Sequence, residues 1–174
     1  MGLRRSVNGA IAGGVAAALW AAQQPLDKRA FASGYDDVEL LGKAVVRGDG
    51  WRPAGAAMHI ANGAAFGATY AQLRRFLPGP ALAQGPALAL AEHFALWPLG
   101  RVSDRYHPRR KELTTLTGNR AAFWQAFYRH ALFGATMALL EARLNADAEP
   151  EDPEPIPVSS NGHGDIKLAV SGAA

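Results

Sequence analysis

Four long segments of the chain consist mainly of Ala, Gly, Leu and other uncharged residues, and more polar stretches separate them. Each segment is long enough to form a helix that crosses a hydrocarbon layer of about 30 Å, at a rise of about 1.5 Å per residue. The pattern therefore predicts an all-α protein, a four-helix antiparallel transmembrane bundle. The predicted spans are residues 6–26, 53–73, 80–99 and 120–144.

The stretches between the spans carry turn and cap signals. In the mixed-charge connection of residues 27–52, Asp36 or Asp37 is expected to cap a short helix. Residues 74–80 form a tight turn, and Asn119 is expected to cap the fourth helix. From residue 146 onward the chain is rich in Asp, Glu and Pro, then in Gly and Ser, and is predicted to be disordered. The chain thus divides into a membrane domain, residues 1–145, and a tail, residues 146–174.

Two short sequences occur twice. Phe-Gly-Ala-Thr is found at residues 66–69 and 133–136, and Pro-Leu lies near the ends of the first and third spans, at 25–26 and 98–99. A duplicated two-helix hairpin would explain both repeats and would relate the halves by an axis along the membrane normal. Because Ala-rich helices also match by chance, both explanations stay open.

Small residues in the spans are spaced for close helix packing. Lipid gives helices no hydrophobic reason to associate, so close backbone contact through small residues must hold them together. Gly9 with Gly13, and Gly63 with Gly67, have the Gly-x-x-x-Gly spacing, and Gly134 continues the pattern in the fourth span. We predict that these glycines lie at helix–helix contacts.

Every tryptophan falls at the same end of the bundle when the spans are drawn antiparallel. These residues are Trp20, Trp51, Trp97 and Trp124, each near a Lys or Arg. An indole ring and a long basic side chain both prefer the headgroup region of a membrane. We therefore expect the tryptophans to be anchors at one membrane interface.

Ionisable side chains inside the spans lie at similar depths below the tryptophans, about 6–12 Å along the helix axes. Such residues are costly inside a membrane and usually face the interior of the bundle. The candidate polar intramembrane layer consists of His59, Asn62, Glu92, His93, Arg129 and His130.

Three interpretations of this layer stay open. An ion pair between Glu92 and Arg129, with hydrogen-bonding histidines around it, would be a structural feature of the bundle. Three imidazoles and one carboxylate match the ligands of zinc or iron, although no His-x-x-x-His or Glu-x-x-His pair is present. Histidines that titrate near neutral pH would make the layer respond to protons. We expect the structural interpretation, with no metal and no cofactor.

Composition excludes several classes of protein. The 174 residues carry a net charge of +3, with the Lys and Arg residues between the spans instead of along one face, so no nucleic-acid partner is expected. Without cysteine, disulfides and thiol catalysis are excluded. No Gly-x-Ser-x-Gly, P-loop or dinucleotide-binding motif is present, and the sequence assigns no catalytic residue. The mean hydropathy of -0.06 is low for a membrane protein, which the polar tail and the Ala/Gly-rich spans partly explain.

The basic residues also indicate an orientation. More Lys and Arg lie in the connections after the first and third spans than on the opposite side, which places those connections in the cytoplasm and both termini outside. The basic run at residues 109–111 is either a site for anionic lipid headgroups or a solvated loop.

The glycine-rich first span that ends near a proline, together with the run of His59, Gly63 and Gly67 at four-residue spacing, resembles the YagU-like family of small bacterial proteins. The resemblance covers residues 6–144. It implies a multi-pass protein of the bacterial inner (cytoplasmic) membrane with a poorly defined activity, and some members of the family are linked to stress tolerance.

Three functional hypotheses follow. The favoured one is a small integral membrane protein of undefined biochemical activity, a structural or stress-related component whose partners are the lipid bilayer and either a second copy or another protein. The second is a soluble or peripheral Ala-rich bundle with a buried His/Glu/Arg ligand or metal site. The third is an oligomeric membrane enzyme or transporter that uses the polar layer. A non-enzymatic role is favoured.

Overall fold

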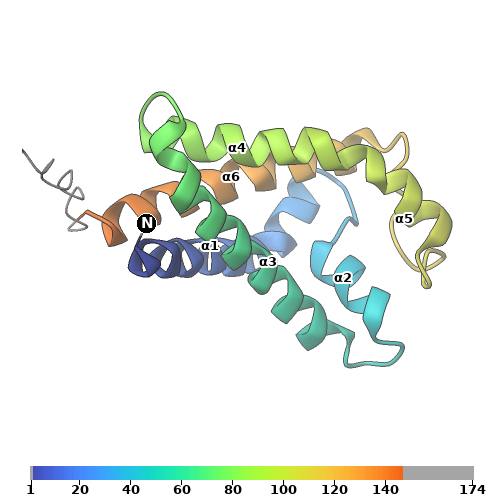
Figure 1. The fold of residues 1–174 in the computed structure, drawn as a ribbon. Helices are drawn as coiled ribbons and strands as arrows, with labels where there is room; N and C mark the ends of the chain where they lie inside the picture. Colours follow the sequence, from blue (N-terminus) through green and yellow to red (C-terminus); the bar gives the residue numbers. More distant parts are fainter. Residues whose placement is uncertain (1, 147–174) are drawn as a thin grey trace, which may run out of the picture.

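The computed structural model describes residues 2–146, and this part of the chain is all-α, as predicted, without a strand (Figure 1). The predicted disordered tail lies, from residue 147 onward, outside the described residues. The α-helices are α1 (Leu3–Ala30), α2 (Asp37–Val45), α3 (Trp51–Leu73), α4 (Ala81–Leu96), α5 (Gly100–Tyr106) and α6 (Arg120–Leu144). Short 3-10 turns follow α3 and α4, at Arg74–Phe76 and Trp97–Leu99.

The helix caps follow the sequence signals. The Asp36 carboxylate accepts a hydrogen bond from the Glu39 amide at 2.9 Å and begins α2, and the Asn119 side chain accepts one from the Ala122 amide at 3.0 Å and begins α6. Both predicted caps are confirmed. α1 differs, because it continues through Pro25 to Ala30, beyond the predicted end of the first span.

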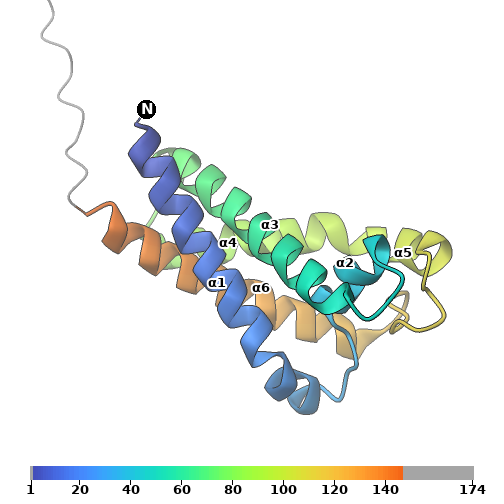
Figure 2. The same cartoon turned by 90° about the horizontal axis from the view of Figure 1, so that it is seen from below.

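The long helices form two antiparallel hairpins. α1 packs against α3 and α6, and α4 packs against α6 (Figures 1 and 2). α3 and α4 share the turn between the two halves and then diverge in Figure 1. Each half therefore has the same order of elements, a long helix, a short helix and a second long helix.

Backbone-to-backbone contacts at glycine join the helices of each hairpin. Gly67 faces Gly9, and Gly63 faces Gly13, so that a Cβ atom added at any of them would overlap the opposite helix. In the second hairpin, a Cβ at Gly134 would lie 2.5 Å from the carbonyl oxygen of Gly85. Gly67 and Gly134 are the glycines of the repeated Phe-Gly-Ala-Thr sequence, so the repeat marks the corresponding contact in both halves.

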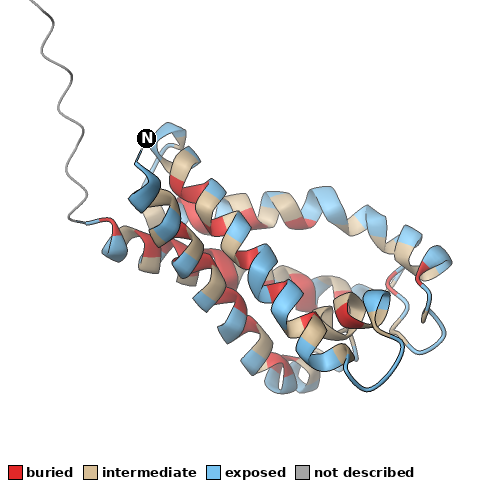
Figure 3. Ribbon diagram, turned by 60° about the horizontal axis from the view of Figure 1, so that its bottom comes forward, coloured by how far each residue is buried: buried red, intermediate tan, exposed pale blue. Residues whose placement is uncertain are grey.

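The interior consists of small and polar residues, and the large apolar side chains lie outside. Most of the buried hydrophobic residues are alanines, and Leu116 is the only leucine, valine or isoleucine buried among residues 2–146. The largest fully buried side chains include those of Arg129, Gln125 and Glu141. In Figure 3 the buried residues follow the facing sides of the helices and the exposed ones the outer surface. Within the described range, none of the helices combines the length and the apolar character needed to cross a membrane.

Polar contacts close the end of the bundle where the described chain begins and ends. The Arg74 guanidinium pairs with Glu141, which is fully buried and also accepts a hydrogen bond from the Asn145 amide at 2.8 Å. The Asn8 side chain donates to the Leu144 carbonyl at 2.8 Å. These contacts tie α3, α6 and α1 together at one end.

Gly67→Ala is expected to lower the melting temperature of the protein. The new Cβ would overlap the Gly9 carbonyl, a backbone atom that moves only if the two helices separate. Overpacking of this kind costs about 1–3 kcal/mol. The larger changes Gly67→Leu and Gly134→Leu are expected to prevent folding, and a variant that accumulates normally and stays monodisperse would contradict the contact.

Gly14→Ala is the matched control for Gly67→Ala. A Cβ at Gly14 would make ordinary contacts, 3.7 Å from Ile60 and 3.8 Å from Ala64. Because alanine favours a helix over glycine by about 1 kcal/mol, this variant is expected to melt at or above the temperature of the native chain. Circular dichroism melting of both purified variants measures the difference, and equal destabilisation would show that the facing backbone is not what excludes a side chain.

Candidate functional site

A buried arginine joins three parts of the chain at one end of the bundle, opposite the end where Arg74 pairs with Glu141. Arg129 of α6 is fully buried and donates from Nε and Nη2 to the two Asp27 carboxylate oxygens, both at 2.6 Å. Its Nη1 donates to Asp37 at 2.7 Å. The predicted pairing of Arg129 with Glu92 is therefore wrong. The reason is that α1 extends past Pro25 and brings Asp27 to the guanidinium.

Asp37, the first residue of α2, is held by two further donors. The Tyr35 hydroxyl donates to one carboxylate oxygen at 2.6 Å, and the Trp20 indole nitrogen donates to the other at 3.1 Å. Burial raises the pKa of Tyr35 well above its ordinary value, and the Asp37 charge raises it further, so that the phenol stays a proton donor. Both oxygens of Asp37 are thus occupied by partners within the protein.

Trp20 lies in the interior of the bundle, which differs from its predicted place as an interface anchor. Its side chain is 6% exposed, and its ring contacts His59, His130 and Phe133 edge-on. The hydrogen bond to Asp37 accounts for this position, because it gives the indole nitrogen a buried partner.

The loop before α2 is fixed by a second carboxylate. Asp36 pairs with Lys28 at 2.5 Å, and it also caps α2. Burial raises the pKa of the Asp36 carboxyl, but the hydrogen bonds from Lys28 and from the Glu39 amide outweigh it and leave the pKa below its ordinary value. The carboxylate therefore stays charged and holds the start of α2 against the end of α1.

The α5 side is fixed in a similar way. Asp104 accepts hydrogen bonds from the amides of Leu116 at 3.0 Å and Thr117 at 2.7 Å. Burial raises the pKa of Asp104, but these hydrogen bonds and that of the Thr117 hydroxyl lower it below its ordinary value. The His107 ring, at the end of α5, hydrogen-bonds the Leu40 carbonyl of α2 at 3.0 Å. α2 and α5 are thus joined over the end of the bundle.

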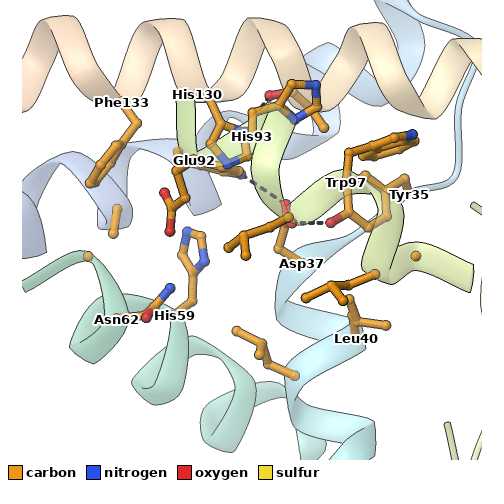
Figure 4. Close-up of a pocket in the computed structure, with 18 of the residues that line it drawn as sticks. Tyr35, Asp37, Leu40, His59, Asn62, Glu92, His93, Trp97, His130 and Phe133 are labelled. Atoms are coloured by element: carbon orange, nitrogen blue, oxygen red, sulfur yellow. Dashed lines mark hydrogen bonds between the residues drawn. The ribbon is translucent and has the colours of Figure 1, made fainter. Parts of the chain in front are cut away.

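Beneath α2 and α5, where α3 and α4 diverge, lies a cavity of about 420 Å³ (Figure 4). Side chains from all four long helices line it. Asn62, Leu96 and Leu99 line the cavity and are also exposed, so that it opens to the surface between α3 and α4. The polar lining residues are Tyr35, Asp37, His59, Asn62, Glu92, His93, Ser103 and His130.

Three histidines from three helices stand around this cavity. His130 contacts Trp20 and His93 at ring-centroid distances of 4.8 Å and 4.9 Å, and His59 contacts Trp20 at 5.1 Å. The Nδ1 atom of His130 is bonded to the Ala126 carbonyl at 2.7 Å. The Nε2 atoms of His59 and His93 are buried and have no hydrogen-bond partner within the described chain. Unpartnered buried nitrogens are costly, and these two have almost no accessible surface, so they pack against the protein and are not presented to the cavity.

Glu92 is half-buried at the cavity wall, and no ion pair or hydrogen bond of its side chain occurs among residues 2–146. Its carboxyl group and the His59 ring point toward one another in Figure 4. None of the described residues lining the cavity is a Lys or Arg. Glu92 is therefore a carboxylate without a balancing cation at this site.

The cavity gathers most of the predicted polar layer. His59, Asn62, Glu92, His93 and His130 line it, and Arg129 does not, because it is turned toward Asp27. Among residues 2–146, no three His, Asp or Glu side chains are grouped so that they could hold a metal ion, which gives no support to the zinc or iron interpretation.

The other three tryptophans and the predicted basic run lie at the same end of the molecule as the cavity. Trp97 lines the cavity, and Trp124 is half exposed on α6. Trp51, at the start of α3, stacks against the cations of Lys43 and Arg52, 5.4 and 4.9 Å from its ring centroid. In the basic run at residues 109–111, Arg109 pairs with Glu112 at 2.6 Å.

The sequence prediction missed Asp27, Tyr35 and Gln125. Gln125 donates to Asp27 at 2.7 Å and is fully buried. The signal for Asp27 is its spacing from Trp20, since residues seven positions apart share a helix face. Because the predicted first span ended at Leu26, the prediction did not include Asp27 in that face.

Comparisons of the chain with protein-family models, with curated proteins and with solved structures gave no significant match. The fold and the site together define an all-α helical bundle with a polar, aromatic-lined cavity at one end. The resemblance to YagU-like proteins stays a prediction.

Arg129→Met is expected to destabilise the protein strongly. Asp27 and Asp37 would remain at the core of the bundle without this cation, and breaking a buried ion pair on one side costs about 3–5 kcal/mol. Arg109→Met is the matched control, because it removes an arginine whose partner, Glu112, is exposed and screened by solvent. Thermal unfolding followed by tryptophan fluorescence compares the two, and similar melting temperatures would contradict the proposed importance of the buried pair.

Proposed function

We propose that this protein is a small integral membrane protein whose bundle interior binds a small molecule, in a cavity close to one membrane surface. The bacterial inner membrane is the location we infer. The biochemical role is that of a ligand-binding membrane component, without covalent chemistry.

One observation carries the membrane part of the proposal, the distribution of residue sizes around α1. Before Trp20, the buried residues of this helix are all small: Gly9, Ala12, Gly13, Ala16 and Ala17. Its outer face exposes a stripe of large apolar side chains at four-residue spacing: Leu3, Val7, Ile11, Val15 and Leu19. In a water-soluble bundle the large apolar residues face the core, whereas helices in lipid pack through small residues and turn large apolar ones outward.

Hydropathy averaged along a helix counts both of its faces. The inner face of α6 carries Gln125, Arg129 and Glu141, which lower the average of that helix and are shielded within the bundle. What lipid contacts is the outer face, where Leu139 and Leu144 are exposed on the same helix. A polar interior with an apolar exterior therefore supports the membrane proposal independently of the helix averages.

The cavity supports the ligand-binding part. Its volume of about 420 Å³ falls within the usual range for small-molecule sites, roughly 300–1,000 Å³. Its walls combine aromatic and aliphatic side chains with a few polar groups, the composition typical of such sites. The Glu92 side chain, which has no hydrogen bond or ion pair among residues 2–146, gives a ligand a specific group to bind.

Fractionation of cells that express the chain tests the location. We expect the protein in the membrane pellet, and we expect it to stay there after alkaline carbonate extraction, because its outer surface is embedded in the hydrocarbon layer. Release by carbonate would favour a peripheral bundle, and recovery in the soluble fraction would overturn the membrane proposal while leaving the cavity to be tested by itself.

Val15→Lys is expected to reduce the amount of protein inserted in the membrane. Val15 is exposed near the middle of α1, where a charge facing hydrocarbon costs about 2.5–3.5 kcal/mol. Val45→Lys is the matched control, since Val45 is also exposed but ends α2, outside the predicted spans. Quantified membrane-fraction yields compare the variants. If Val15→Lys inserts as well as Val45→Lys, the outer face of α1 does not contact lipid.

A further inference from the structure

We infer that the ligand of the cavity is a small organic cation that carries a primary ammonium group. This inference rests on the proposed ligand-binding function and adds the chemical class of the ligand. Three features of the cavity support it: its charge, its aromatic walls and the unpaired carboxylate oxygens of Glu92.

The charge of the lining selects for a cation. Two carboxylates, Asp37 and Glu92, line the cavity, and none of its described lining residues is a Lys or Arg. Arg129 balances Asp37, whose oxygens also accept hydrogen bonds from Trp20 and Tyr35. Glu92 has no such partner, so the negative charge available to a ligand is that of Glu92. An anion would be repelled, and a neutral molecule would leave this charge unpaired in a partly buried site.

The aromatic walls suit the same ligand. Phe66, Trp97 and Phe133 line the cavity together with Trp20 and Tyr35. An aromatic face attracts a cation electrostatically, and the attraction grows when the cation loses water. The walls also give apolar contact to a carbon skeleton attached to the ammonium group. Aromatic rings around a carboxylate therefore favour an organic cation over a hydrated metal ion, in agreement with the lack of a three-ligand metal group among residues 2–146.

The unpaired carboxylate favours a primary ammonium over a quaternary one. The oxygens of an ionised carboxylate act only as hydrogen-bond acceptors, and the Glu92 side chain has no hydrogen bond or ion pair among residues 2–146. A primary ammonium has three N–H donors to offer these oxygens, whereas a quaternary ammonium has none.

Two sources would supply this chemistry, a free amine and the ethanolamine headgroup of a membrane lipid. The cavity opens between α3 and α4, beside the exposed residues Asn62, Leu96 and Leu99, and both sources have access there. The experiment below separates them.

Matched aromatic probes test the charge preference. The purified full chain, in nanodiscs of phosphatidylcholine, is titrated by calorimetry with phenethylamine, with the neutral isostere 2-phenylethanol and with the anion 3-phenylpropanoate. We expect the amine to bind at least about tenfold more tightly than the alcohol, since a hydrogen bond to a charged group is worth about 1.5–3 kcal/mol, and we expect no measurable binding of the anion.

Glu92→Gln tests the residue. It keeps the shape of the side chain and removes its charge, so we expect the amine to lose about tenfold or more in affinity and the alcohol to lose little. Glu112→Gln, the same change on an exposed loop residue outside the cavity, is expected to leave both affinities unchanged. Because the comparison of the three probes uses the native chain, it decides the question even if Glu92→Gln does not fold.

The outcomes separate this inference from the proposed function. Equal affinity for amine and alcohol, or an amine affinity unaffected by Glu92→Gln, would overturn the cation inference and leave a ligand-binding cavity in place. Failure of all three probes to bind would count against both. If phosphatidylethanolamine added to the nanodiscs displaces phenethylamine, the source of the ligand is a lipid headgroup. If only free ethanolamine displaces it, the source is a soluble amine. Each outcome supports a primary ammonium ligand.

Discussion

The pairing of Arg129 with two carboxylates is the interaction on which the arrangement of the site depends. Asp27 lies near the end of α1, Asp37 begins the short helix α2, and Arg129 lies within a third element, α6. Removing these charges from water is costly unless every donor and acceptor is matched, and here Tyr35 and Trp20 complete the set. One guanidinium thereby holds the end of α1 and the start of α2 against α6, with α2 over the cavity.

The cavity exists because helix packing and ion pairing act at different places. Glycine contacts hold α1 to α3, and α4 to α6, but no comparable contact joins α3 to α4 beyond their shared turn. α3 and α4 therefore diverge toward the tryptophan end, while α1 and α6 stay packed together there, and α2 and α5 cover the space between α3 and α4. The two carboxylates in this space differ in their partners. Asp37 pairs with Arg129 and accepts hydrogen bonds from Trp20 and Tyr35. Glu92 has no hydrogen bond or ion pair among residues 2–146, so its carboxylate is the one available to a ligand.

Much of the fold followed from local signals, and the site followed only in part. Helix caps at Asp36 and Asn119 were predictable because they depend on neighbouring residues alone. The polar layer was predictable as a set, since residues at equal depth on adjacent helices meet. The partner of Arg129 was not, because the first span was ended at Leu26, where the uncharged run stops, whereas α1 continues to Ala30 and includes Asp27. The buried position of Trp20 was missed for another reason, because its hydrogen-bond partner, Asp37, comes from a separate element, α2. The angle between α3 and α4, which sets the size of the cavity, is a property of the assembled bundle.

The inner face of α1 also determines how sequences with this fold are free to vary. At Gly9 and Gly13 the opposite backbone leaves no space for even a methyl group, whereas Val7, Ile11 and Val15 contact no neighbouring helix closely enough to be buried. On the outer surface, one large apolar residue could therefore replace another without effect. In the interface between the helices, no large residue would be accepted. In most families of water-soluble proteins, large core residues are retained among related sequences and polar surface residues vary. Here the spacing of the smallest residues would carry the information that defines the fold.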